Sequence, residues 1–196
     1  MSPIVEPLGE RALRFAIEPH VDRRALLDAL RSLDGVIDAV ITETHAAVSF
    51  EREPPVIDDA LLARSSVATA PREHLIRVAY DGPDLQAVAD ALSLDTASLI
   101  ARHTAATYEV SFVGFLPGFA YLRGLDPELA SLPRRASPRP RVPAGSVALA
   151  GGFTGIYPFA TPGGWMLLGR AIDHRPLDPR GEPLLALGDR VRFEQA

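Results

Sequence analysis

The first 80 residues alternate between strand-like and helix-like spacing of apolar side chains. Within residues 21–33 alanine and leucine recur at helical spacing, and Gly35 follows where a C-cap glycine would end the helix. The predicted elements, in order, are a strand at 11–17, a helix at 21–33, strands at 36–41 and 46–50, a helix at 57–63 and a strand at 74–80. This order is that of a ferredoxin-like fold, and it predicts a first domain over residues 1–80.

Beyond residue 80 the pattern changes. Two short helices are predicted at 85–92 and 96–103, and after them glycine and proline separate short apolar runs. These runs are residues 108–115, 146–150, 165–169 and 190–193. Short strands in such a succession are typical of a compact β-barrel or sandwich. The sequence therefore predicts an α+β protein with a barrel domain at 81–196, in which proline-rich residues 138–141 form an exposed loop.

Residues 108–170 concentrate the features expected around a site. They hold most of the 15 glycines, interleaved with aromatic and β-branched side chains. Glycine permits backbone conformations closed to other residues, and proline fixes φ and removes a donor. A folded segment rich in both contains tight, specified turns, and we expect those turns to surround a binding site.

Composition excludes several classes of function. The 196 residues carry a formal net charge of −5, and the chain contains neither cysteine nor lysine. A Schiff-base lysine, a P-loop lysine, a thiol nucleophile and a disulfide framework are therefore absent. The acidic balance gives no reason to expect nucleic acid, and neither a signal peptide nor a membrane span is predicted. We expect a cytoplasmic protein with no membrane partner.

Three motifs stand in a fixed order in the second domain: GFLPGFAYLRGLDP at 114–127, PRPRVPAGSVALAG at 138–151 and TGIYPFATPGGWMLLGR at 154–170. Together they resemble the KipI family, also called allophanate hydrolase subunit 1 or the 5-oxoprolinase B subunit. The resemblance covers roughly residues 74–196, and the first domain matches in layout more than in motif. It implies a ferredoxin-like first domain followed by a cyclophilin-like β-barrel of the carboxyltransferase C/D type.

The resemblance also implies an activity and partners. With the A and C subunits, such a chain resembles a part of the bacterial ATP-dependent 5-oxoprolinase, which opens 5-oxoproline to glutamate. ATP with Mg²⁺ would act in that hetero-oligomer, and we do not expect this chain to bind it alone. Two alternatives stay open: a KipI-like inhibitor of a sensor histidine kinase, and a subunit that processes allophanate or urea-type amides. The family usually has glutamine where Phe153 precedes TGIYP, which leaves the substrate open.

Three side chains are candidates for catalysis. His103 ends a predicted helix, where the family often has histidine, and could act as a general acid or base or simply interact with the helix dipole. Arg139 and Arg141 belong to a run of four arginines within residues 134–141. Arginine suits carboxylate or phosphate, although a solvated loop explains the same run.

The glycine turns supply the remaining candidates. Their N–H groups could face a ligand, although a tight barrel corner with core aromatics explains the same pattern. The expected substrate-binding residues are Gly114, Phe115, Pro117, Gly118, Tyr121, Ser146, Thr154, Gly155, Tyr157 and Arg170. Arg170 could instead pair with Asp173. No metal site is expected, because Asp173 and His174 have no third ligand at a suitable spacing.

A partner surface is predicted as well. The apolar runs 147–149 and 165–168 exceed what a small barrel is expected to cover. Interface cores are enriched in aromatic residues. We therefore expect Trp165 or Tyr157 to pack against the 5-oxoprolinase C subunit.

Overall fold

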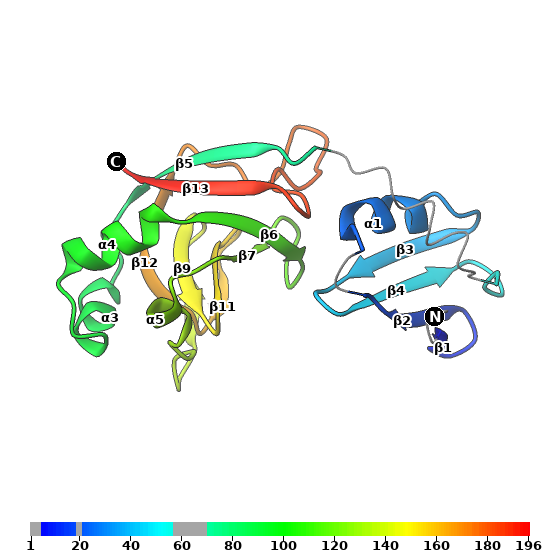
Figure 1. The fold of residues 1–196 in the computed structure, drawn as a ribbon, viewed down its shortest axis with the longest axis horizontal. Coiled ribbons are helices and arrows are strands. Elements are labelled where there is room, and N and C mark those ends of the chain that lie inside the picture. Colours follow the sequence, from blue (N-terminus) through cyan, green and yellow to red (C-terminus); the bar gives the residue numbers. More distant parts are fainter. Residues whose placement is uncertain (1–4, 19–20, 57–69) are drawn as a thin grey trace. The chain divides into compact units, whose positions relative to one another are not determined.

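A computed structural model describes residues 5–18, 21–56 and 70–196. The chain divides into two compact units, Met1–Ala70 and Pro71–Ala196. Figure 1 shows the elements of each unit. None of the helices in the described ranges is long and apolar enough to cross a membrane.

The first unit contains a four-stranded antiparallel sheet in the order β1-β2-β4-β3. Its elements are β1 (Val5–Pro7), β2 (Ala12–Ala16), α1 (Arg23–Arg31), β3 (Val36–Ile41) and β4 (His45–Phe50). The Asp22 carboxylate accepts hydrogen bonds from the N–H groups of Arg24 and Ala25, which begins α1 as an N-cap should. The predicted helix and hairpin are confirmed, whereas the helix expected at 57–63 lies outside the described residues.

The strand predicted at 74–80 does not complete this sheet. It forms β5 (Glu73–Ala79), which pairs with two strands of the second unit. The edge position beside β2 is occupied by β1 instead. Assigning this strand to the first domain was therefore wrong, and the ferredoxin-like pattern is not confirmed.

The second unit is built on a seven-stranded closed barrel with the ring order β10-β7-β6-β13-β5-β12-β9. The other barrel strands are β6 (Thr107–Val113), β7 (Ala120–Arg123), β9 (Ser146–Ala150), β10 (Phe153–Ile156), β12 (Met166–Ile172) and β13 (Arg190–Gln195). β5 and β13 pair in parallel, and the other described pairs in the ring are antiparallel. The barrel expected from the short apolar runs is confirmed, and its cyclophilin-like character stays a prediction.

Smaller elements cover the barrel. Helices α3 (Leu85–Ala91), α4 (Thr96–Ala105) and α5 (Pro127–Ala130) pack against β12, β13 and β9 respectively. Strands β8 (Arg139–Val142) and β11 (Thr161–Gly163) form a separate two-stranded sheet. Residues 138–141 were predicted to be a loop, and most of them form β8 instead. A two-stranded sheet tolerates this, since proline is acceptable in an edge strand that needs few donors.

Candidate functional site

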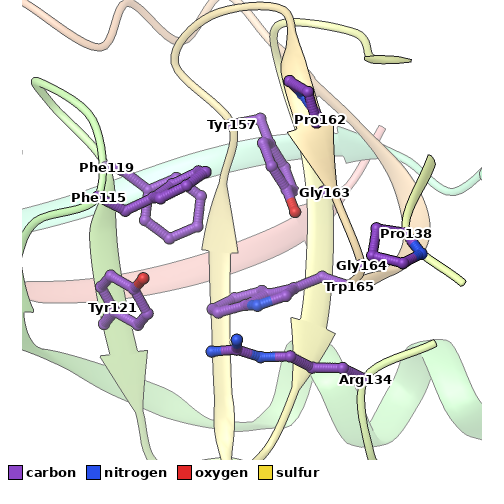
Figure 2. A pocket seen from close by; sticks show the side chains of 10 residues that line it. All are labelled: Phe115, Phe119, Tyr121, Arg134, Pro138, Tyr157, Pro162, Gly163, Gly164 and Trp165. Atoms are coloured by element: carbon purple, nitrogen blue, oxygen red, sulfur yellow. The ribbon is translucent and has the colours of Figure 1, made fainter. Parts of the chain in front are cut away.

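An open pocket of about 240 Å³ lies on the face of the barrel that carries β8 and β11 (Figure 2). This volume falls slightly below the range of roughly 300–1,000 Å³ typical of ligand pockets, so it suits a small molecule. The lining residues are Phe115, Phe119, Tyr121, Arg134, Pro138, Tyr157, Pro162, Gly163, Gly164 and Trp165. Three of the residues expected to bind substrate are among them, namely Phe115, Tyr121 and Tyr157.

Aromatic rings form the floor and walls of the pocket. Phe119 is at the centre, with its ring 4.9 Å from Tyr121 and 5.3 Å from both Tyr157 and Trp165, in edge-to-face contacts. A Cβ on Gly155 would lie 2.8 Å from the Ala120 carbonyl oxygen and 3.4 Å from the Trp165 ring. Gly155 therefore shapes the floor by letting β10 approach β7 closely, and it does not line the pocket itself.

The turn 114–118 holds Phe115 over the pocket. Phe115 has φ +70°, unusual for a residue with a side chain, and it is 62% exposed. The Gly114 N–H donates to the Phe119 carbonyl, and the Phe119 N–H donates to the Leu116 carbonyl. These two donors are therefore used inside the turn. Pro117 and Gly118 shape the same turn, and neither lines the pocket.

Polar chemistry in the pocket comes from one guanidinium and two phenols. Arg134 points toward the aromatic group in Figure 2, and within the described residues its side chain has neither a hydrogen bond nor an ion pair. Burial raises the pKa of Tyr121, and the Arg134 charge partly offsets it. Burial also raises the pKa of Tyr157, against the lowering effect of the Trp165 N–H. Both phenols are thus protonated at neutral pH and can donate hydrogen bonds to a ligand.

The arginines expected to bind an anion are placed differently. Arg139 donates to the Asp84 carboxylate at 2.7 Å, and Arg135 donates to the same oxygen at 3.1 Å. Arg141 is exposed and does not line the pocket. Of the four arginines in the run, only Arg134 faces the pocket. An anion-binding role for Arg139 and Arg141 stays a prediction, and the structure places neither of them in the pocket lining.

Asp84 is a residue that the sequence analysis missed. It is 5% exposed, and its second carboxylate oxygen accepts from the Leu167 N–H at 2.7 Å. Burial would raise its pKa, but the Arg139 and Leu167 hydrogen bonds and the Arg139 and Arg135 charges lower it overall. The carboxylate is therefore ionised at neutral pH. An acidic residue in a turn, combined with a distant arginine run, was the only signal available.

His103 lies in a buried hydrogen-bonded chain away from the pocket. The Thr154 hydroxyl donates to the Ala148 carbonyl and therefore accepts from Nε2 of His103, at 3.0 Å. Nδ1 then accepts from the Tyr80 hydroxyl at 2.7 Å. The ring also stacks on Phe193, with centroids 4.8 Å apart. Burial lowers the pKa of His103 to about 3, so its imidazole is neutral.

With both nitrogens engaged and no surface exposed, His103 is placed as a structural residue. Thr154 belongs to the same hydrogen-bonded chain as His103, so we place it as a structural residue as well. Ser146 is buried in β9, outside the pocket lining. Arg170 pairs with Asp81 at 3.0 Å, whereas Asp173 pairs with Arg77. Thus neither a site for Arg170 nor its expected pair with Asp173 is found among the described residues.

The expected partner surface is covered by this chain. Tyr157 and Trp165 are only 2% and 5% exposed and belong to one core cluster. Residues 147–149 are likewise fully buried. The expectation that these residues face a partner subunit is wrong. Tyr157 and Trp165 pack with Phe119 and with Val142 of β8, whereas Val147 lies in the barrel core and Leu149 packs with residues of α3, α4 and α5.

The pocket lining is poorly suited to hold a divalent cation. No cluster of three or more His, Cys, Asp or Glu side chains occurs in the ranges that the structure describes. The pocket lining has one cation and no carboxylate or imidazole. Its residues fit a small anionic ligand better than a metal-bound nucleotide.

Comparison with known proteins identifies the family. Residues 3–183 match the family described as carboxyltransferase domain, subdomain C and D. The chain belongs to this carboxyltransferase-domain family. A relative from Escherichia coli O157:H7, named as the B subunit of 5-oxoprolinase, is 38% identical over 95% of this chain and 93% of its own.

Solved structures share the fold of this chain. The crystal structure of TTHA0988 superposes with a TM-score of 0.77 at 38% identity, covering 95% of this chain. This chain spans only 40% of TTHA0988. The Kluyveromyces lactis urea carboxylase shares the fold, with a TM-score of 0.65 at 18% identity over 99% of this chain and 22% of that one.

Proposed function

We propose that this carboxyltransferase-family chain is the B subunit of an ATP-dependent 5-oxoprolinase and that the aromatic pocket binds 5-oxoproline. The names of relatives at 34–46% identity support the first part. The second part rests on Arg134, which faces an aromatic pocket of about 240 Å³ and has no partner within the described residues.

The ligand's chemistry matches the lining residues. 5-Oxoproline is a small, nearly flat ring with one amide and one carboxylate. Aromatic walls can pack on the ring, and the planar guanidinium of Arg134 can take the carboxylate through two parallel hydrogen bonds. The Tyr121 and Tyr157 hydroxyls can donate to the amide carbonyl, which orients it and draws charge toward its oxygen.

The same lining explains why the chain would need partners. Hydrolysis of an unstrained amide has little thermodynamic driving force, and ATP would supply it by phosphorylating the amide oxygen. Water would then add at the carbon, and the C–N bond would break to leave glutamate with an acyl phosphate, which a second water would hydrolyse to glutamate and phosphate. Such a step needs a base and ligands for Mg²⁺. Carboxylates and imidazoles are missing from the pocket lining. We propose that the A and C subunits contribute these groups and the Mg²⁺–ATP site.

A binding experiment tests the pocket directly. Trp165 is the only tryptophan of the chain and lines the pocket, so its fluorescence reports occupancy. Because a charge-assisted hydrogen bond contributes about 1.5–3 kcal/mol, Arg134→Gln should weaken 5-oxoproline binding by about tenfold or more. Arg141→Gln makes the same charge change outside the pocket and should bind normally. Equal affinities for wild type and Arg134→Gln would remove Arg134 from the proposal.

A further inference from the structure

The pocket has two walls that come from distant parts of the sequence. One is the loop 134–138 before β8, and the other is the segment 162–165 before β12. Figure 2 shows Arg134 and Pro138 on the first wall and Gly163, Gly164 and Trp165 on the second. The Arg135 N–H donates to the Gly164 carbonyl at 2.7 Å, which is a direct link between the walls. The position of a ligand in this pocket therefore depends on the hydrogen bonds that hold the two walls together.

The Asp84 carboxylate binds residues in or next to both walls. One carboxylate oxygen accepts from Arg135 Nη1 and Arg139 Nη2, and the other accepts from the Leu167 N–H. On the first wall, Arg135 follows Arg134 and Arg139 follows Pro138. Leu167 lies in β12, two residues after Trp165 of the second wall. Each contact of Asp84 thus fixes a residue next to, or two residues from, one that lines the pocket.

The hydrogen bonds of the Asp84 side chain go to the residues beside the pocket and not to the helix that it precedes. It occupies the N-cap position of α3, but its side chain makes no capping hydrogen bond to the helix. An N-cap aspartate ordinarily accepts from the helix N–H groups. In the described residues Arg135 Nε and Arg139 Nη1 are buried and have no acceptor at all. Asp84 is therefore the carboxylate on which both guanidinium groups depend.

We propose that Asp84 is a positioning residue of the pocket, which fixes the two walls and so holds Arg134 where it selects a carboxylate ligand. The selection rests on the proposed function, whereas the fixing of the walls does not. Without Asp84, the loop that carries Arg134 loses its side-chain link to Leu167 of β12 and keeps only the Arg135 N–H bond to the Gly164 carbonyl.

Hydrogen exchange of the free chain tests the fixing of the walls. In Asp84→Asn the amides of residues 134–139 and 163–167 should exchange about tenfold faster, because the side-chain bonds that join the two segments through Asp84 no longer oppose their local opening. Asp81→Asn is the matched control, since it makes the same change in the same turn but breaks only the exposed pair with Arg170. Unchanged exchange in Asp84→Asn would overturn the proposal.

A second variant covers the case in which Asp84→Asn does not fold. Arg139→Gln leaves Asp84 bonded to Arg135 and to the Leu167 N–H, and it should speed exchange of the same two segments to a smaller extent. If both walls exchange as in wild type, Asp84 does not act through Arg139 and the proposal fails.

Ligand preference separates positioning from a purely structural role. We compare 5-oxoproline with 2-pyrrolidinone, the same ring without the carboxylate, by Trp165 fluorescence. Wild type should prefer 5-oxoproline, and the preference should fall by about tenfold in the folded Asp84 or Arg139 variants while 2-pyrrolidinone binding is retained. Lower stability with an unchanged preference would overturn the positioning role. If wild type binds no 5-oxoproline, the proposed function fails, and the exchange experiment alone decides whether Asp84 fixes the walls.

Discussion

Acid pH should destabilise the barrel through His103. The imidazole is fully buried, its two nitrogens are engaged by Tyr80 and Thr154, and burial lowers its pKa to about 3. In the unfolded chain a histidine titrates near about 6.5. Below that pH the unfolded chain takes up a proton that the folded barrel does not. Proton binding therefore stabilises the unfolded state, and the stability of the folded barrel falls as the pH falls.

The size of this effect follows from the two pKa values. Each pH unit between the folded-state pKa and the unfolded-state pKa of His103 is equivalent to about 1.4 kcal/mol of stability. Lowering the pH from about 7.5 to about 5 should therefore remove about 2 kcal/mol of stability through His103. His174 adds to the loss in the same direction, because burial, together with the charge of His74, lowers its pKa to about 4. The stability is fully present above a pH of about 6.5 and is lost progressively below it.

Urea unfolding at about pH 7.5 and about pH 5 measures the effect, with Trp165 fluorescence as the probe for the second unit. His103→Gln should be less stable than wild type at the higher pH, because it disturbs the contacts with Tyr80 and Thr154. Its further loss at the lower pH should be smaller than that of wild type by about 2 kcal/mol. His45→Gln, an exposed change in the first unit, is the control. An equal loss in wild type and His103→Gln would refute the reasoning and would reopen a catalytic role for this histidine.

Two further predictions concern the pocket. Gly155→Ala should lower stability by about 1–3 kcal/mol in urea unfolding, because its Cβ would lie 2.8 Å from a backbone oxygen that must move. Gly114→Ala, where a Cβ meets no atom within 4 Å, should leave stability nearly unchanged, and similar losses in the two variants would contradict this packing. Trp165→Ala should lower the stability of the isolated chain by about 3–5 kcal/mol, as loss of a large core side chain does. An unchanged thermal midpoint, followed by circular dichroism, would restore the account in which Trp165 serves a partner interface.

The sequence predicted the elements better than their partners. The pattern of residues 74–80 is correct for a strand, but an alternating strand fits either domain equally well. Its partners, β12 and β13, lie roughly a hundred residues further along the chain. Local spacing carries no information on such a pairing, so the strand was assigned to the sheet nearest in sequence.

The sequence predicted three of the aromatic residues that line the pocket and did not distinguish the arginine that faces it. Four neighbouring arginines look alike until the fold brings Asp84 against two of them and leaves Arg134 in the pocket. His103 did carry a usable signal. It lies four residues after Leu99 on α4, and both are fully buried, so the two share the apolar face of the helix. That spacing favours a core histidine.

Glutamate formation from 5-oxoproline and ATP, measured with the purified A and C subunits, tests the central claim most directly. The account predicts activity only when this chain is added, none from this chain alone, and a reduced rate at low 5-oxoproline concentration with Arg134→Gln. Arg141→Gln should restore the full rate. Glutamate formation by this chain alone, or an equal rate from the A and C subunits without it, would contradict the account.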